Sequence, residues 1–104
     1  LALGQGAQAA QHLQTWVALH PRDGAAWQQL AGVHAAQGQA LRAVRAQAEA
    51  QVAWLDYAAA MDRFKAAQDL VRKGGAGADH IEASIIDTRA RQVESLLREQ
   101  MLER

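Results

Sequence analysis

Cysteine is absent from this chain of 104 residues, which excludes disulfides and thiolate chemistry. Net charge is also absent, because 11 basic residues balance 11 acidic ones. No overall field therefore draws in nucleic acid or an anionic membrane surface. No apolar run approaches the roughly 18 residues that a bilayer span requires. We expect a protein that neither binds nucleic acid nor inserts directly into a membrane.

Proline occurs once and aromatic residues make up 5% of the chain, whereas half of its residues are apolar and nearly half of these are alanine. Alanine, glutamine, leucine, arginine and glutamate lose little side-chain freedom on a helix, so they favour helix almost everywhere. The length suits one small domain. The composition predicts an all-α fold with no sheet and a thin core.

A period of 34 residues runs through the first half of the chain. Gly4 and Gly38 are 34 apart, and so are Ala9 and Ala43, in the matching segments GQGAQAA and GQALRAV. Thirty-four residues is the length of the tetratricopeptide repeat, in which two antiparallel helices form one unit. The spacing therefore predicts tandem helical hairpins.

The tetratricopeptide pattern W-x2-L-G-x2-Y can be placed on the segment after the single proline. Pro21 falls on the proline that ends one repeat unit in the pattern. Proline ends a helix because it has a fixed φ and no donor N–H, and Asp23 can then cap the helix that follows. Alanine replaces glycine and histidine replaces tyrosine in this segment. The pattern is carried by Trp27, Leu30, Ala31 and His34.

The same register predicts helices at about 6–20, 24–37, 40–55 and 57–73. Residues 1–73 thus form about two repeats. The first helix should face inward with Ala9, Leu13 and Trp16, and Gly38 should end the second. The second-helix pattern reappears in the fourth segment, at Tyr57, Ala60, Phe64 and Ala67.

A glycine-rich stretch, residues 74–79, is expected to connect the repeats to a last helix within 80–104. It lacks the preceding strand and the following Lys-Ser or Lys-Thr of a phosphate-binding loop. Asp79 and Glu82 have capping-box spacing, which predicts a helix at about 80–102. We expect this helix to cap the open end of the repeats. Its inward stripe is expected to be Ile86, Ala90, Val93, Leu97 and Met101.

From Trp27 onward the chain resembles the C-terminal tetratricopeptide region of bacterial periplasmic zinc metallopeptidases of the β-barrel assembly-enhancing type. The more specific segments are Arg45-Ala-Gln-Ala-Glu49, the Leu55-Asp56 turn and SIIDTR at residues 84–89. Leu55 stands where glycine is common in the family. The resemblance implies a periplasmic protein with an upstream His-Glu-x-x-His peptidase domain that holds the zinc. We expect this chain to be a piece of such a longer protein.

A catalytic or metal site is not expected in the chain itself, and neither is a cofactor. A zinc helix of this class needs two histidines at i and i+4, and none of the four histidines is so spaced. His34 takes a packing position, so we expect a core or half-buried histidine with a satisfied ring.

A binding groove is the remaining candidate site. On the repeat register the concave face includes Gln28, Arg42, Arg45 and Glu49. Arg42 and Arg45 lie three apart and could clamp a carboxylate or the carbonyls of a peptide. The alternative is a solvated face with an internal Arg45–Glu49 ion pair. Aromatic bulk for the core is expected from Trp16, Trp27 and Trp54.

Two functions of different class remain open. One is a noncatalytic interaction module of an envelope metallopeptidase in outer-membrane protein assembly or quality control. It would bind protein or peptide clients and dock on its own upstream peptidase domain. The other is a free-standing tetratricopeptide adaptor with no enzyme attached. A homodimer is compatible with either, because two repeats are few for independent stability.

Overall fold

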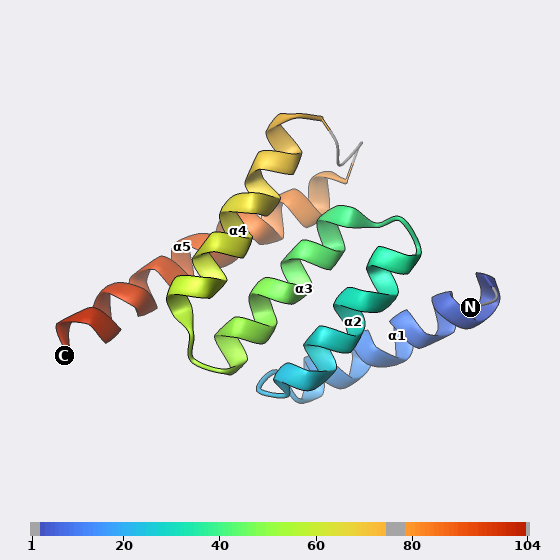
Figure 1. The fold of residues 1–104 in the computed structure, drawn as a ribbon, viewed down its shortest axis with the longest axis horizontal. Coiled ribbons are helices and arrows are strands. Elements are labelled where there is room, and N and C mark those ends of the chain that lie inside the picture. Colours follow the sequence, from blue (N-terminus) through green and yellow to red (C-terminus); the bar gives the residue numbers. More distant parts are fainter. Residues whose placement is uncertain (1–2, 75–78, 104) are drawn as a thin grey trace.

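The computed structural model describes residues 3–74 and 79–103, and five α-helices make up most of this part (Figure 1). They are α1 (Leu3–Leu19), α2 (Gly24–Ala36), α3 (Ala40–Ala53), α4 (Tyr57–Arg72) and α5 (His80–Leu102). No strand occurs among the described residues, so the all-α prediction is confirmed for them. Most of the expected glycine-rich connector, residues 75–78, lies outside the described part.

Three of the helices begin at an aspartate whose side chain caps the first turn. The carboxylates of Asp23, Asp56 and Asp79 each accept a hydrogen bond from the backbone N–H three residues further on, at 3.0, 3.1 and 3.1 Å. These bonds satisfy one of the N–H groups that the start of a helix leaves without a partner. The capping roles predicted for Asp23 and Asp79 are confirmed.

Left-handed backbone conformations follow three of the helices, at Gly38, Leu55 and Gly74. Gly38, with φ of 74°, follows α2 as predicted. Leu55 follows α3 with φ of 63°, in a region that L-residues with large side chains rarely adopt. The turn therefore has the geometry that favours glycine, although leucine occupies it.

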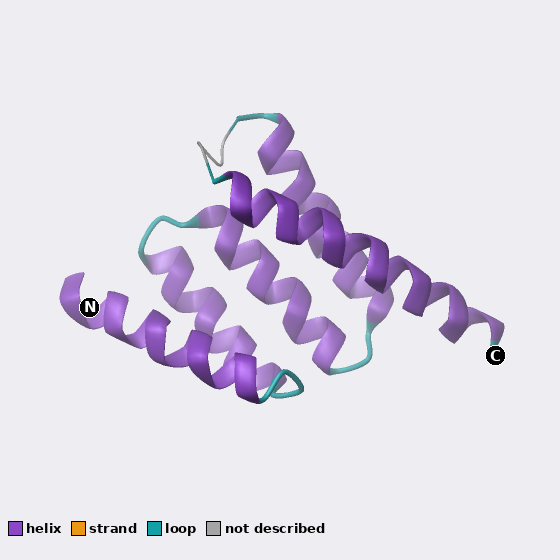
Figure 2. Ribbon diagram, turned by 180° about the vertical axis from the view of Figure 1, so that it is seen from behind, coloured by secondary structure: helices purple, strands orange, loops and turns teal. Residues whose placement is uncertain are grey.

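The helices form two layers. α2, α3 and α4 lie side by side in one layer. α1 and α5 form the second layer and cross one face of the first, the face that is turned away in Figure 1 and toward the viewer in Figure 2. Each helix packs on the next along the chain, and α5 also reaches α3. Within the described residues, α2 and α4 make no close backbone approach to each other.

Two apolar clusters hold the layers together. The larger joins α3, α4 and α5 around Phe64, Ile86 and Val93, each with 0% exposure. The smaller joins α1, α2 and α3 around Leu30 and Val17. Alanines fill the rest of the helix contacts, which lets the backbones approach closely. Full burial of Ala60, Phe64 and Ala67 agrees with their predicted repeat positions.

The expectation that Trp16 and Trp54 lie in the core is wrong. Their exposed fractions are 42% and 52%, and Trp27 is only half-buried. Trp16 stacks on His20 at a ring-centroid distance of 4.0 Å and donates to the Asp23 carboxylate at 2.8 Å. Trp54 rests on the backbone of Gly24, where a Cβ would collide with the ring. Both side chains sit at helix ends, Trp16 in the last turn of α1 and Trp54 directly after α3.

The inward stripe of α5 is confirmed over its first half. Ile86, Ala90 and Val93 are buried and Leu97 is partly buried, but Met101 is 61% exposed. The last turns of α5 project beyond the other helices (Figure 1). None of the other described helices therefore covers Met101.

Candidate functional site

A cluster of ion pairs joins α3 to α5, and we call it the α3–α5 ion cluster. Nε of Arg42 lies 3.2 Å from the Asp79 carboxylate, and Arg45 pairs with Glu82. Arg45 is also 3.7 Å from Glu49, its neighbour one turn on. Its members are Arg42, Arg45, Glu49, Asp79, Glu82 and Arg89.

The best-formed pair of the cluster is Arg89 with Glu49. Nε and Nη2 of Arg89 each donate to one carboxylate oxygen of Glu49 at 2.8 Å, which is the bidentate geometry of a strong pair. The exposed fractions of the side chains are 29% for Arg89 and 8% for Glu49. The hydrogen bonds to Glu49 raise the pKa of Arg89 above its ordinary value, although burial acts in the opposite direction. This pair links α5 to α3 directly.

Asp79 and Glu82 connect the start of α5 to the same cluster. Burial raises the pKa of the Asp79 carboxyl, but the Glu82 N–H and the Arg42 guanidinium together hold it below its ordinary value. Of the predicted capping box, only the hydrogen bond from the Glu82 N–H to the Asp79 carboxylate is present. The Glu82 carboxylate instead accepts a hydrogen bond from Arg45 on α3.

The predicted groove residues do not form an open arginine clamp. Arg42 and Arg45 are each paired with a carboxylate from the start of α5, so a ligand would have to displace that carboxylate. The predicted Arg45–Glu49 pair is present, but it is not on a solvated face, because α5 covers it. Gln28 is exposed on α2 and takes part in none of the hydrogen bonds of this cluster among the described residues. The sequence could not place α5 over these residues.

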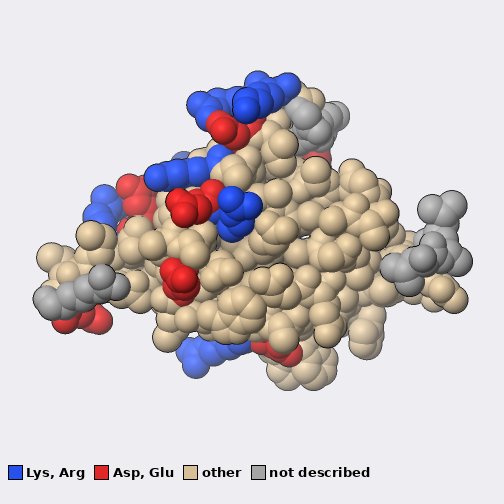
Figure 3. Space-filling model, in the orientation of Figure 1, with Lys and Arg blue, Asp and Glu red and all other residues tan. Residues whose placement is uncertain are grey.

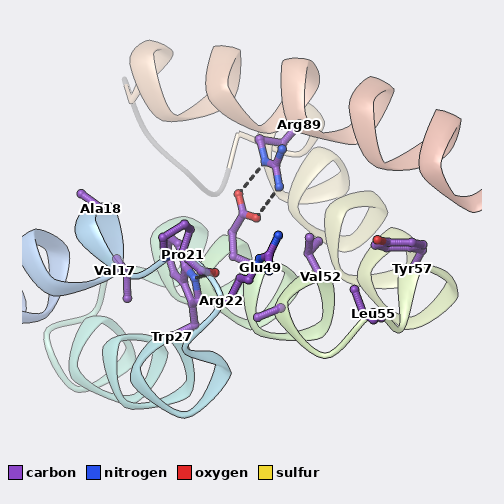
Figure 4. A pocket seen from close by; sticks show the side chains of 11 residues that line it. Val17, Ala18, Pro21, Arg22, Trp27, Glu49, Val52, Leu55, Tyr57 and Arg89 are labelled. Carbon is purple, nitrogen blue, oxygen red and sulfur yellow. Dashed lines mark hydrogen bonds and ion pairs between the residues drawn. The ribbon is translucent and has the colours of Figure 1, made fainter.

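A groove of about 750 Å³ lies beside the cluster, between α1 and α5 and over α3, and we call it the α3 groove (Figure 4). Glu49 and Arg89 close one wall. The remaining walls are mostly apolar and aromatic, with a single further charge. The groove is lined by Val17, Ala18, Pro21, Arg22, Trp27, Glu49, Val52, Ala53, Leu55, Tyr57 and Arg89.

Two features fix the chemistry of the α3 groove. Nε1 of Trp27 donates to the Pro21 carbonyl at 3.1 Å, and the Arg45 guanidinium lies 5.8 Å from the centre of the ring, so the indole is held in place. Arg22 also lines the groove, and it forms no ion pair within the described part of the chain. The groove thus combines an oriented aromatic wall with one uncompensated cation.

Charge is distributed unevenly over the molecule. Arg22 and Asp23 are the only Lys, Arg, Asp or Glu residues among the first 41. Charged side chains therefore gather over α4 and α5, while the face over α2 and much of α3 is almost uncharged (Figure 3). The Asp23 carboxylate is occupied by Trp16 and by the Ala26 N–H, which both lower its pKa. Arg22 is thus the single free charge on the α1 side of the groove.

The histidines do not form a metal site in the described part of the chain. His34 is 3% exposed, and its Nδ1 donates to the side-chain oxygen of Gln39 at 2.7 Å, which confirms the satisfied core histidine. Within residues 3–74 and 79–103, no three His, Asp or Glu side chains gather closely enough to hold a metal ion. Among the described helices, none combines the length and apolar character needed to cross a membrane.

Sequence reasoning found only part of this site. Glu49 was selected for the groove and Arg89 appears in the segment that carries the family resemblance, but their pairing was not foreseen. Arg22 was missed. Its isolation in a nearly uncharged stretch of 41 residues was the available signal. Comparisons with protein-family models, curated proteins and solved structures find no match to this chain.

Proposed function

We propose that this chain is a noncatalytic protein-binding module and that the α3 groove holds a segment of a client protein. The observation that carries the proposal is the groove itself, with its apolar floor, its oriented Trp27 and its free Arg22. Its volume of about 750 Å³ lies in the range of pockets that hold a small molecule, which is enough for a few side chains of a client. Tryptophan, tyrosine and arginine are the side chains that most often dominate binding energy at protein interfaces.

A tetratricopeptide-like architecture, closed by α5, belongs to this proposal. The antiparallel packing of α2 on α3 and of α4 on α5 supports it, as does the burial of Leu30, Ala31 and His34 at their repeat positions. The missing approach between α2 and α4 distinguishes these hairpins from a tightly stacked array. That separation leaves α3 in the middle of its layer, where its opposite face forms the floor of the groove.

As the parent protein we propose an envelope zinc metallopeptidase, with this chain as its C-terminal client-binding domain. The support is the sequence resemblance, together with the fact that Glu49 contacts both Arg45 and Arg89, and all three belong to the resembling segments. In this proposal the zinc belongs to the upstream domain and the protein is periplasmic. Isolation of the intact parent from fractionated cells, followed by measurement of its mass and zinc content, tests this assignment. A metal-free parent outside the periplasm would favour the free-standing adaptor.

A variant that fills the groove tests the binding proposal directly. Ala18 lines the groove from α1 and is exposed, so Ala18→Trp adds bulk without removing core atoms. Ala35→Trp, on the exposed face of α2, is the matched control. Proteins that bind from an envelope extract to each form of the chain are quantified by mass spectrometry. We expect the unmodified chain and Ala35→Trp to retain the same proteins, and Ala18→Trp to retain none of them. Equal retention by both variants would show that the groove is not the binding site.

A further inference from the structure

The first layer contains three helices and the second contains two, and the α3 groove lies in the space between the two helices of the second layer. One layer contains α2, α3 and α4, and among the described helices α1 and α5 alone cross one face of it (Figure 2). α1 packs on α2, and α5 packs mainly on α4. The strip of α3 that carries Val52 and Ala53 is therefore left without a helix of its own.

A helix is the occupant that best fits this position. An α-helix has a diameter of about 10–12 Å with its side chains and packs on a neighbouring helix at about 8–10 Å. It would lie between α1 and α5 and place an apolar stripe on Ala18, Trp27 and Val52. Addition of a β-strand requires a sheet edge, which the described residues do not contain. Helix-in-groove recognition uses the surface that is present.

The charges of the groove favour an acidic partner. Glu49 and Arg89 neutralise each other through their bidentate pair. Arg22 remains, and the neighbouring Asp23 carboxylate already accepts hydrogen bonds from Trp16 and Ala26. A carboxylate on the partner can therefore pair with Arg22 without displacing a contact of the chain.

We propose that the α3 groove binds an amphipathic helix whose apolar residues recur at i, i+3 or i+4, and i+7, and whose flank places an aspartate or glutamate against Arg22. This inference rests on the proposed function and names the class of segment that the groove takes. The bound helix completes the second layer as its middle member. The apolar stripe supplies affinity, and the Arg22 pair selects acidic over basic helices.

Selection from an unbiased library of random peptides of about 16 residues, roughly 24 Å long when helical, tests the proposal. Peptides are selected on the unmodified chain and counter-selected on Ala18→Trp, and their affinities are then measured by fluorescence anisotropy. We expect enriched sequences with the helical apolar spacing and a flanking acidic residue. Changing that acidic residue to lysine is expected to weaken binding at least tenfold. A proline in the middle of the peptide is expected to weaken binding to a similar extent, because it breaks the helix.

Charge reversal at the groove provides the second arm. Arg22→Glu is expected to invert the preference, so that lysine-bearing versions bind more tightly than acidic ones. Arg63→Glu, at an exposed position on α4 outside the groove, is expected to leave the preference unchanged. Circular dichroism of both variants verifies that their helix content equals that of the unmodified chain.

The outcomes separate this inference from the proposed function. Enrichment of proline-rich or extended peptides, or equal binding of acidic and basic versions, would overturn the acidic helix and leave the groove as a binding site. The acidic-helix proposal would also be overturned if no peptide were enriched more strongly on the unmodified chain than on the Ala18→Trp variant. In that case the extract experiment with Ala18→Trp and Ala35→Trp still decides whether the groove binds a protein.

Discussion

Replacing Arg89 by methionine removes the bidentate partner of Glu49, whose side chain is only 8% exposed. Breaking a fully buried pair in this way costs about 3–5 kcal/mol, because one charge stays behind without compensation. Here the cost is smaller, since Arg89 is 29% exposed and Arg45 remains 3.7 Å from Glu49. We therefore expect Arg89→Met to lower the free energy of unfolding by about 2 kcal/mol. For a domain of this size that is a fall in melting temperature of roughly 10 °C.

Urea unfolding followed by circular dichroism measures this effect, and α5 itself offers a matched control. Arg98 is 68% exposed and lies 3.9 Å from Glu94, so Arg98→Met is expected to cost no more than about 0.5 kcal/mol. The double variant Glu49→Leu with Arg89→Met removes both charges together. It should be more stable than Arg89→Met alone, because no buried carboxylate is left unpaired. Equal losses for Arg89→Met and Arg98→Met would refute the role assigned to the Glu49–Arg89 pair.

Three further predictions concern the backbone and the acid limb of stability. Gly32 lies within α2 and a Cβ there would meet open space, so Gly32→Ala should stabilise the fold by about 1 kcal/mol. Gly38 has a φ of 74°, so Gly38→Ala should destabilise the fold. Denaturation midpoints of the two variants that shift in the same direction would contradict this prediction. Leu55→Gly should raise the free energy of unfolding by up to about 1 kcal/mol, since relief of left-handed strain exceeds the added entropy of the unfolded chain. A lowered free energy of unfolding would mean that side-chain packing of Leu55 dominates. The pKa of Asp79 is lower in the folded chain than its ordinary value of 3.8, so its contribution is present above that pH and is lost as pH falls through the folded pKa. Asp79→Asn keeps the helix cap and should reduce the loss of stability in acid, and an acid limb of unchanged steepness would argue against this contribution.

Local signals in the sequence were sufficient for the helices and for most of their ends. The aspartate caps, Pro21 and Gly38 act on the backbone within a few residues, so their effects can be read without knowing the fold. The repeat spacing also placed Leu30, Phe64 and His34 inside, because helical periodicity fixes which side chains share a face. The same periodicity failed for Trp16 and Trp54, since it says nothing of how far a neighbouring element extends.

The sequence by itself thus determined an all-helical chain in the described part, the order of its helices and the burial of Leu30, His34 and Phe64. Only the tertiary structure decided that α5 covers Arg42 and Arg45, that Glu49 pairs with a residue 40 positions away, and that a groove stays open between α1 and α5. The physical reason is that capping and helix propensity act over a few residues of one segment. Ion pairs and grooves between helices depend on how separate segments pack, and that packing is set by the sum of many weak apolar contacts across the whole chain.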